Sequence, residues 1–171
     1  MSNKYIVAKR FSNYYKFIKN TQNYTLEKKL IRTNLHINKI IPKHDKKGDN
    51  KWSTPKEFLL NGYGDCEDYA IAKFATLLEL NINIKKLYLA VVKSKGSDGL
   101  HMVLLYRGEK EIFVLDNLSW KVLPIHKRKD LIFKYAFNNQ NSFEIKNNKL
   151  VVEKKTRRVE SLLLKNILLE R

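Results

Sequence analysis

The chain is organised around the segment Asn61-Gly-Tyr-Gly-Asp-Cys-Glu-Asp-Tyr-Ala-Ile-Ala-Lys73, which contains its only cysteine, Cys66. The two glycines favour a sharp turn, and the Ala- and Leu-rich residues that follow, up to Leu80, predict a buried helix. Cys66 is therefore expected at a helix N-terminus, where the helix dipole and free N–H groups lower the pKa of a thiol. A lone cysteine is more often a small buried apolar residue, so its position alone does not make Cys66 a nucleophile.

The composition indicates one basic domain over residues 1–171. This length is sufficient for a hydrophobic core without disulfides or a structural metal. The 34 Lys and Arg residues outnumber 17 Asp and Glu residues, which gives a net charge of +17. Such an excess favours nucleic-acid or anionic membrane partners, but the lysines are dispersed among Asn and Ile, so we expect no nucleic-acid binding. A single cysteine excludes an intramolecular disulfide and a multi-cysteine zinc site.

The sequence contains no apolar run long enough to cross a bilayer, so no membrane-spanning segment is expected. The first ten residues also lack the apolar core of a signal peptide. From the residues alone, the protein is expected either to stay in the cytoplasm or to have lost a leader.

Helices are predicted on the N-terminal side of the cysteine. Apolar residues recur at spacings of three and four over residues 11–41, which predicts one or two amphipathic helices that end at Pro42. A short helix is predicted to follow a polar loop. Thr54 is a suitable N-cap for it, the next residue is proline, Glu57 completes a capping box, and Gly62 is typical of a C-cap.

Strands are predicted after the cysteine helix, in apolar segments at residues 86–92, 101–106 and 111–116. Both faces of these strands are apolar, so we expect helices on one side of the sheet and further structure on the other. A symmetric two-residue hairpin at Gly108-Glu109 would place His101 directly opposite Asp116. A carboxylate at that distance can orient an imidazole.

Cys66, His101 and Asp116 are together the three parts of a cysteine nucleophile, its base and the group that orients the base. Taken singly, His101 is as readily an ordinary strand histidine, and Asp116 an ordinary strand-end residue. The same hairpin argument gives no opposing carboxylate to the other histidines, which are His36, His44 and His126.

The C-terminal part of the chain has weaker periodicity. Residues 130–137 are interpreted as a turn of helix, the Asn-rich residues 138–148 as a turn or connector, and residues 159–169 as a terminal amphipathic helix.

Three acids, Asp65, Glu67 and Asp68, flank the thiol, and carboxylates beside a thiolate raise its pKa. In one interpretation they are helix-start acids, with Asp65 as the cap and Asp68 three residues later. In the other, they hold a hard cation, for which calcium is the candidate, and Asp45 and Asp49 complete its shell. The spacing is not that of an EF-hand, so the sequence leaves both interpretations open.

Five segments resemble the bacterial transglutaminase-like cysteine proteinases, the family of periplasmic Lap-type proteases that clip large adhesins from the cell surface. They are Asn34-x-x-x-Asn38, Trp52-Ser-Thr-Pro-Lys-Glu-Phe-Leu59, Gly62-Tyr-Gly-Asp-Cys-Glu-Asp-Tyr-Ala-Ile-Ala-Lys73, His101-Met-Val-Leu104 and Leu115-Asp-Asn-Leu118. The resemblance implies an α+β fold with a papain-like, transglutaminase-type core, in which helices pack on an antiparallel sheet and the nucleophile lies at a helix N-terminus. N-terminal helices at about 11–41 would precede a catalytic core at about 52–137 and a C-terminal tail.

The same resemblance implies a site and a biological setting. Cys66, His101 and Asp116 would be the triad, and calcium would be bound through Asp65 and Glu67, with Asp68 a weaker candidate. The substrate would be a large adhesin in the setting of a biofilm, the location periplasmic, and the inhibitor an inner-membrane receptor that reads cyclic di-GMP.

The predicted reaction is peptide-bond hydrolysis, in which His101 takes the Cys66 proton and the thiolate attacks a backbone carbonyl. The Cys66 N–H is one candidate oxyanion donor, and Trp52 or a residue near Tyr63 is the second. Two alternatives are a transglutaminase-like acyltransferase, which would pass the acyl group to an amine, and a non-catalytic basic binding module with a structural cysteine.

Overall fold

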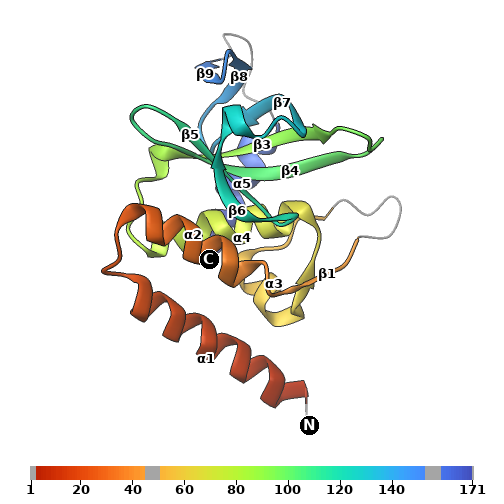
Figure 1. Ribbon diagram of the computed structural model, residues 1–171. Helices are drawn as coiled ribbons and strands as arrows, with labels where there is room; N and C mark the ends of the chain where they lie inside the picture. The colour runs from red at the N-terminus through yellow and green to blue at the C-terminus, as the bar shows by residue number, and fades with distance from the viewer. Residues whose placement is uncertain (1–2, 45–50, 153–158, 171) are drawn as a thin grey trace.

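The computed structural model describes residues 3–44, 51–152 and 159–170, in which helices pack against a twisted sheet (Figure 1). The helices are α1 (Asn3–Thr21), α2 (Leu26–Ile37), α3 (Pro55–Asn61), α4 (Cys66–Glu79) and α5 (Val159–Leu169), with 3-10 turns η1 (Ile84–Lys86) and η2 (Ile125–Lys127). The strands of the main sheet are β3 (Leu87–Ser94), β4 (Leu100–Arg107), β5 (Ile112–Asp116), β6 (Ser119–Pro124), β7 (Leu131–Phe137), β8 (Ser142–Lys146) and β9 (Lys149–Val152). They are antiparallel, in the order β6-β5-β4-β3-β7-β8-β9.

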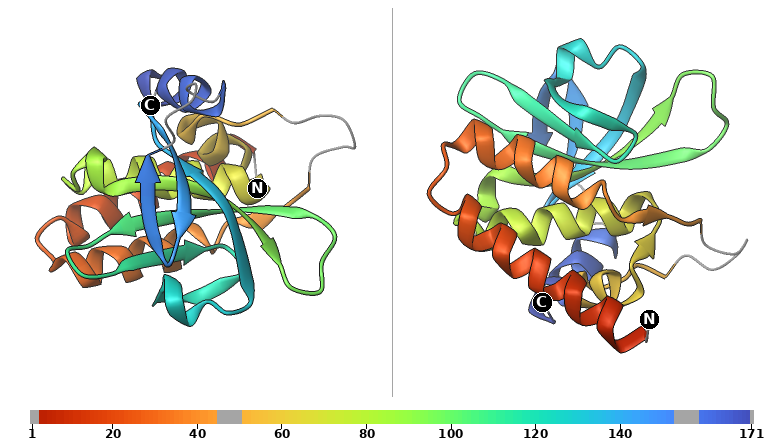
Figure 2. Two further views of the ribbon diagram at one scale, coloured as in Figure 1. Left: turned by 90° about the horizontal axis from the view of Figure 1, so that it is seen from above. Right: turned by 60° about the horizontal axis from the view of Figure 1, so that its bottom comes forward.

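The arrangement confirms the predicted class, with helices packed on an antiparallel sheet and Cys66 as the first residue of a helix. Figure 1 and the right-hand view of Figure 2 place α2 and α4 next to the sheet and α1 on the side of these helices that faces away from it. A second, two-stranded parallel sheet joins β1 (Ile41–Pro42) to β2 (Tyr63–Gly64), just before Cys66. None of the helices in the described ranges is long and apolar enough to cross a membrane.

The two faces of the sheet belong to two apolar cores, which follow the alternation of side chains along the strands. On one face, Leu89 and Leu104 pack with Phe74 of α4 and with Leu164 of α5. On the other face, a second core collects alternate residues of β3, β4 and β5 together with residues of η2, β7 and β8. Both sides of the sheet are therefore covered, as the apolar strands predict.

The helix ends follow the capping signals of the sequence. Thr54 Oγ1 accepts a hydrogen bond from Glu57 N at 3.1 Å, and Glu57 Oε2 accepts one from Thr54 N at 2.8 Å. Gly62 ends α3 in a left-handed conformation with φ +73°. The region predicted as one or two helices contains two, separated before Thr25, which caps α2, although α1 already begins at Asn3.

Two C-terminal predictions are wrong. Residues 130–137 form strand β7 rather than a turn of helix, because they pair with β3, which lies some 40 residues earlier in the chain. The Asn-rich residues 138–148 contain strand β8 rather than only a connector. Short apolar runs do not distinguish helix from strand, and this strand is specified by a distant partner. The helix at residues 159–169 is confirmed.

Gly62 provides a test of the turn that precedes Cys66. A Cβ at this position would overlap the Arg10 guanidinium, which donates hydrogen bonds to the carbonyl oxygens of Leu59 and Leu60. We expect Gly62→Ala to lower the free energy of unfolding by about 1–2 kcal/mol in urea denaturation, from the positive φ and from displacement of the Arg10 hydrogen bonds. Gly96 also has a positive φ, of +83°, but open space around it, so Gly96→Ala isolates the backbone contribution of about 1 kcal/mol. Equal losses in the two variants would contradict the role given to Arg10.

Candidate active site

Cys66 is held in the first turn of α4, a helix whose following residues are almost entirely buried. Its Sγ donates a hydrogen bond to Glu67 Oε2 at 3.1 Å. Burial, and then the charge and hydrogen bond of Glu67, raise the pKa of the thiol, against a smaller opposing effect of the Met102 backbone. Burial and the neighbouring carboxylates together outweigh the helix start, and the thiol is protonated in this arrangement.

His101 and Asp116 are in contact, although the predicted hairpin register is wrong. The turn between β4 and β5 has four residues instead of two, so that Arg107 pairs with Ile112 and Leu104 with Leu115. His101 and Asp116 are consequently diagonal rather than opposed. A shift of two residues leaves both side chains on the same face, and His101 Nε2 still lies 2.8 Å from Asp116 Oδ1.

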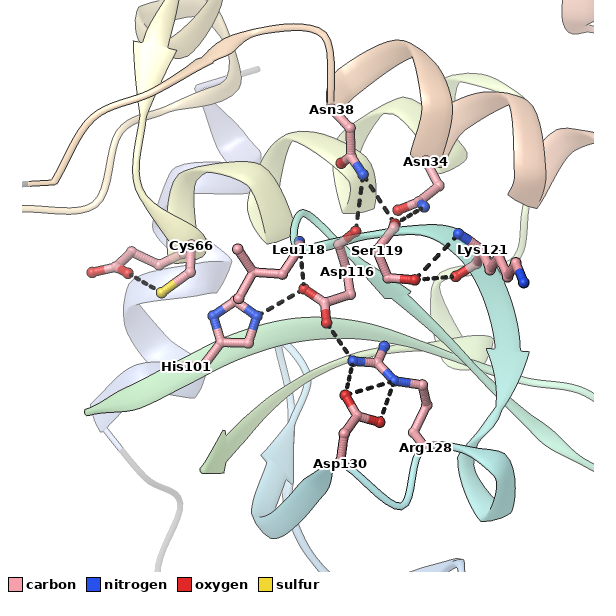
Figure 3. A network of polar contacts seen from close by, with 11 residues as sticks. Asn34, Asn38, Cys66, His101, Asp116, Leu118, Ser119, Lys121, Arg128 and Asp130 are labelled. Carbon is pink, nitrogen blue, oxygen red and sulfur yellow. Dashed lines mark hydrogen bonds and ion pairs between the residues drawn. The ribbon is translucent and has the colours of Figure 1, made fainter. Parts of the chain in front are cut away.

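The Asp116 carboxylate is 1% exposed and is bonded at both oxygens (Figure 3). Besides His101, Oδ1 accepts a hydrogen bond from Leu118 N at 2.9 Å, and Oδ2 accepts one from Arg128 Nη2 at 2.7 Å. Burial by itself would raise the pKa of Asp116, but these hydrogen bonds and the nearby positive charge hold it well below its ordinary value. Asp116 is therefore ionised at neutral pH.

The bond to Asp116 determines which nitrogen of His101 can act as a base. An ionised carboxylate only accepts hydrogen bonds, so Nε2 carries the proton in the neutral imidazole and Nδ1 has the free lone pair. In Figure 3 the Cys66 sulfur lies on the side of the His101 ring opposite Asp116. The backbone of the next residue, Met102, lowers the pKa of the thiol, which places Cys66 close to this end of β4.

Asn34 of α2 and Asn38, the C-cap of that helix, hold the turn that follows Asp116. Asn34 Nδ2 donates to the carbonyl oxygen of Ser119 at 2.8 Å, and Asn38 Nδ2 donates to that of Asp116 at 2.9 Å. They are the asparagines of the Asn34-x-x-x-Asn38 segment, for which the sequence analysis predicted no role. Their spacing of four residues places both on one face of the helix, toward the turn.

The three acids beside the cysteine have different surroundings. Asp68 is buried; its Oδ1 accepts a hydrogen bond from Ser53 N at 2.8 Å and its Oδ2 one from Asp65 N at 3.3 Å, as the helix-cap interpretation predicts. Within the described ranges, the structure brings together no group of three or more His, Cys, Asp or Glu side chains that could hold a metal ion. The further candidates Asp45 and Asp49 lie outside the described residues.

The other candidates of the sequence have separate roles. His36 stacks on Phe17 with ring centroids 4.1 Å apart. His126 does have a carboxylate nearby, Glu111 at 3.6 Å, but both side chains are nearly half exposed, which is typical of a surface ion pair. The indole of Trp52 stacks on the ring of Phe137. Tyr63 is exposed, with Lys43 over its ring, and His44 is exposed as well.

Two cations near Asp116 were missed by the sequence interpretation. Arg128, in a basic segment, is 6% exposed and bonded to Asp116. Lys73, two turns after Cys66 on α4, is 1% exposed; burial lowers its pKa to about 7, against an opposing attraction to Asp116. The one available signal for Lys73 is a lysine within an otherwise apolar helical segment.

Comparison with known proteins shows the family to which the sequence belongs. The sequence matches, over residues 10–155, the family described as bacterial transglutaminase-like cysteine proteinase BTLCP. The chain belongs to this family. It is accordingly a cysteine protease of the transglutaminase-like type, which confirms the family that the five segments resemble.

Solved structures of one bacterial protein are similar over nearly the whole chain. Calcium-bound LapG of Legionella pneumophila is 28% identical, with a TM-score of 0.83, and the match covers 94% of this chain and 90% of that one. EGTA-treated LapG of the same organism is 26% identical, with a TM-score of 0.80, over 99% of this chain and 97% of that one. A search of curated proteins gave no match.

Lys73 predicts a pH dependence of stability. Its pKa is about 7 in the folded protein and 10.5 in the unfolded chain, so the unfolded chain binds more protons at this site between these values. The free energy of unfolding contributed by this group therefore rises with pH from about 7 to 10.5. We expect Lys73→Met to flatten the rise in urea denaturation, and Lys165→Met, at an exposed position of α5, to leave it unchanged. Parallel pH curves for wild type and Lys73→Met would contradict the assignment.

Proposed function

We propose that the protein is a calcium-dependent endopeptidase that cleaves a large cell-surface adhesin in the periplasm, through an acyl-enzyme on Cys66. The observation that carries the proposal is the buried pair of His101 and Asp116, which leaves His101 Nδ1 as the base next to a cysteine at a helix start. Membership of the cysteine proteinase family supports the reaction class. The similarity to LapG supports the choice of an adhesin as substrate and of the periplasm as location.

In the proposed reaction, His101 Nδ1 takes the proton of Cys66 Sγ as the sulfur attacks the carbonyl carbon of the scissile peptide. The imidazolium then gives that proton to the leaving amine nitrogen as the C–N bond breaks. Water, deprotonated by the same Nδ1, hydrolyses the thioester and restores the thiol. Asp116 stays ionised throughout and stabilises the imidazolium through the 2.8 Å contact with Nε2.

The Cys66 backbone N–H is the first proposed oxyanion donor, because an N–H in the first turn of a helix has no partner within the helix. The indole of Trp52 is a weaker choice for the second donor, since its ring is already stacked on Phe137 with the centroids 6.0 Å apart. A backbone N–H near Tyr63, in the turn that leads to the cysteine, is the remaining candidate.

Calcium is proposed on the chemistry of the acids beside the thiol. Asp65 and Glu67 offer hard carboxylate oxygens of the kind calcium prefers, whereas Asp68 already uses both oxygens in bonds to backbone N–H groups. A cation held there would neutralise the charge of Glu67 that raises the pKa of the Cys66 thiol. The similar LapG structures are described as calcium-bound and EGTA-treated.

A regulatory partner is proposed from the family alone. An inner-membrane receptor that responds to cyclic di-GMP would inhibit the protease by sequestering it. This part of the proposal depends on the similarity to Lap-type proteases and not on a surface of the chain.

The reaction is tested by incubating the protein with candidate surface adhesins. We expect Cys66→Ala to abolish cleavage and His101→Gln to lower kcat by at least ~10²-fold. His126→Gln, which removes a surface histidine, should leave kcat unchanged. Cleavage that survives Cys66→Ala would refute the mechanism, and preferential incorporation of a labelled amine would establish the acyltransferase instead.

The metal proposal is tested without substrate, by the effect of calcium on Tm. A cation that binds only the folded protein raises Tm with concentration, so we expect calcium to raise Tm more than magnesium does, and Glu67→Gln to reduce the rise. Glu109→Gln, at an exposed position in the β4–β5 turn, is the matched control. Chelation should also abolish cleavage by the wild type. Cleavage unaffected by chelator would refute the calcium requirement alone.

A further inference from the structure

Arg128 occupies a position with an unusual set of contacts. It follows η2, and its side chain is 6% exposed. Nη2 donates to Asp116 Oδ2 and to Asp130 Oδ2, each at 2.7 Å, and Nε donates to Asp130 Oδ1 at 2.9 Å (Figure 3). The guanidinium is thus fixed by the fork of Asp130 on one edge and presents a single N–H to the carboxylate behind His101.

This N–H fixes the orientation of the Asp116 carboxylate. Oδ1 already accepts hydrogen bonds from His101 Nε2 and Leu118 N, while Oδ2 accepts the bond from Arg128. A rotation of the carboxylate about its Cβ–Cγ bond would therefore break bonds at both oxygens. With Arg128 absent, Oδ2 would lose its donor within a buried site, and the orientation of the group would no longer be determined.

Stability gives a poor explanation for this arrangement. Buried ion pairs add little net stability, because desolvation offsets the attraction between the charges. Asp130 is 60% exposed and does not need Arg128 as a counter-ion. Arg128 Nη1 is buried and has no hydrogen-bond partner among the described residues, which is a further cost. The guanidinium instead fixes the direction from which the Asp116 carboxylate receives a hydrogen bond.

Lys73 differs from Arg128 in this respect. It is also buried and interacts electrostatically with Asp116. An ammonium acts as a point charge, however, whereas a planar guanidinium held at one edge has a fixed donor direction. Charge near Asp116 therefore has two sources, and Arg128 is the one whose donor direction is fixed by a second carboxylate.

We propose that Arg128 is a positioning residue: it holds the Asp116 carboxylate in the orientation that keeps the His101 proton on Nε2 and the Nδ1 lone pair toward Cys66. The inference rests on the proposed hydrolysis for its catalytic meaning. Its structural content, the state of the His101 ring, does not depend on any substrate.

The experiment compares Arg128→Met with two flanking controls, Lys127→Met and Lys129→Met. Both flanking lysines are exposed, so each control removes the same charge without touching Asp116. The first readout is the imidazole ¹⁵N spectrum of His101, assigned among four histidines by the loss of its signals in His101→Gln. We expect the Nε2–H form in wild type and both controls, and a mixture with the Nδ1–H form in Arg128→Met.

The second readout is cleavage of whichever adhesin the wild type cleaves. We expect Arg128→Met to lower kcat by ~10²-fold, the size of effect that a misplaced catalytic group produces, with KM unchanged. Added guanidinium should restore part of the kcat of Arg128→Met and nothing in the controls. Loss of a purely structural contact would lower Tm without producing this rescue or the change of tautomer.

Arg128→Lys and Asp130→Asn decide the matter if Arg128→Met does not fold. Lysine keeps the charge but not the fork, so we expect the mixed His101 tautomers again. Asp130→Asn removes the charge and one of the two acceptor oxygens that hold the Arg128 guanidinium, and should give an intermediate mixture. A His101 spectrum identical to wild type in the folded Arg128 variants would overturn the inference. A changed spectrum without adhesin cleavage by the wild type would refute the proposed function and leave the positioning role intact.

Discussion

Burial of the Asp116 charge is the constraint on which the site depends. A carboxylate that is 1% exposed must receive hydrogen bonds or lose its charge. The donors come from separate parts of the chain, namely β4, the backbone after β5, and the segment after η2, while α2 holds the Asp116 carbonyl oxygen. The hydrogen bonds to the carboxylate and to the carbonyl oxygen of one residue, Asp116, therefore fix the relative positions of all four segments. Cys66 is brought to the same place by the packing of α4 on the sheet.

The sequence predicted those parts of the site that depend on local signals. The N-cap of α3 and its end at Gly62 are determined by residues close to them in the sequence. The same is true of the position of Cys66 at a helix start. His101 and Asp116 were expected in contact for a partly wrong reason. The hairpin has a longer turn than predicted, but an even shift preserves the face on which each side chain lies. The alternation of side chains along a strand therefore predicts which face a residue occupies more reliably than a hairpin argument predicts its cross-strand partner.

The missed features depend on contacts between distant residues. Arg128 reads as one basic residue among several, and nothing adjacent to it reveals that its partner is Asp116. Strand β7 is specified by β3 rather than by its own short apolar run. For the pKa of Cys66 the sequence showed two opposed effects, a helix start that lowers it and neighbouring acids that raise it, and the missing contribution was burial, which is the largest. The net direction of such a pKa shift can be obtained only from the three-dimensional structure, because the individual contributions are large and have opposite signs.

The core is closed by α1 and α5, which are far apart in the sequence, and this has a consequence for how the protein folds during synthesis. Leu164 and Leu168 of α5 lie in the same cluster as Phe17 of α1 and Phe74 of α4. A ribosome adds about 5–20 residues per second. Several seconds therefore pass between the synthesis of α4 and that of α5, which covers its apolar face. During that interval the nascent chain exposes a surface suited to chaperones. The packing around α4, which begins with Cys66, is therefore completed only after α5 has been synthesised.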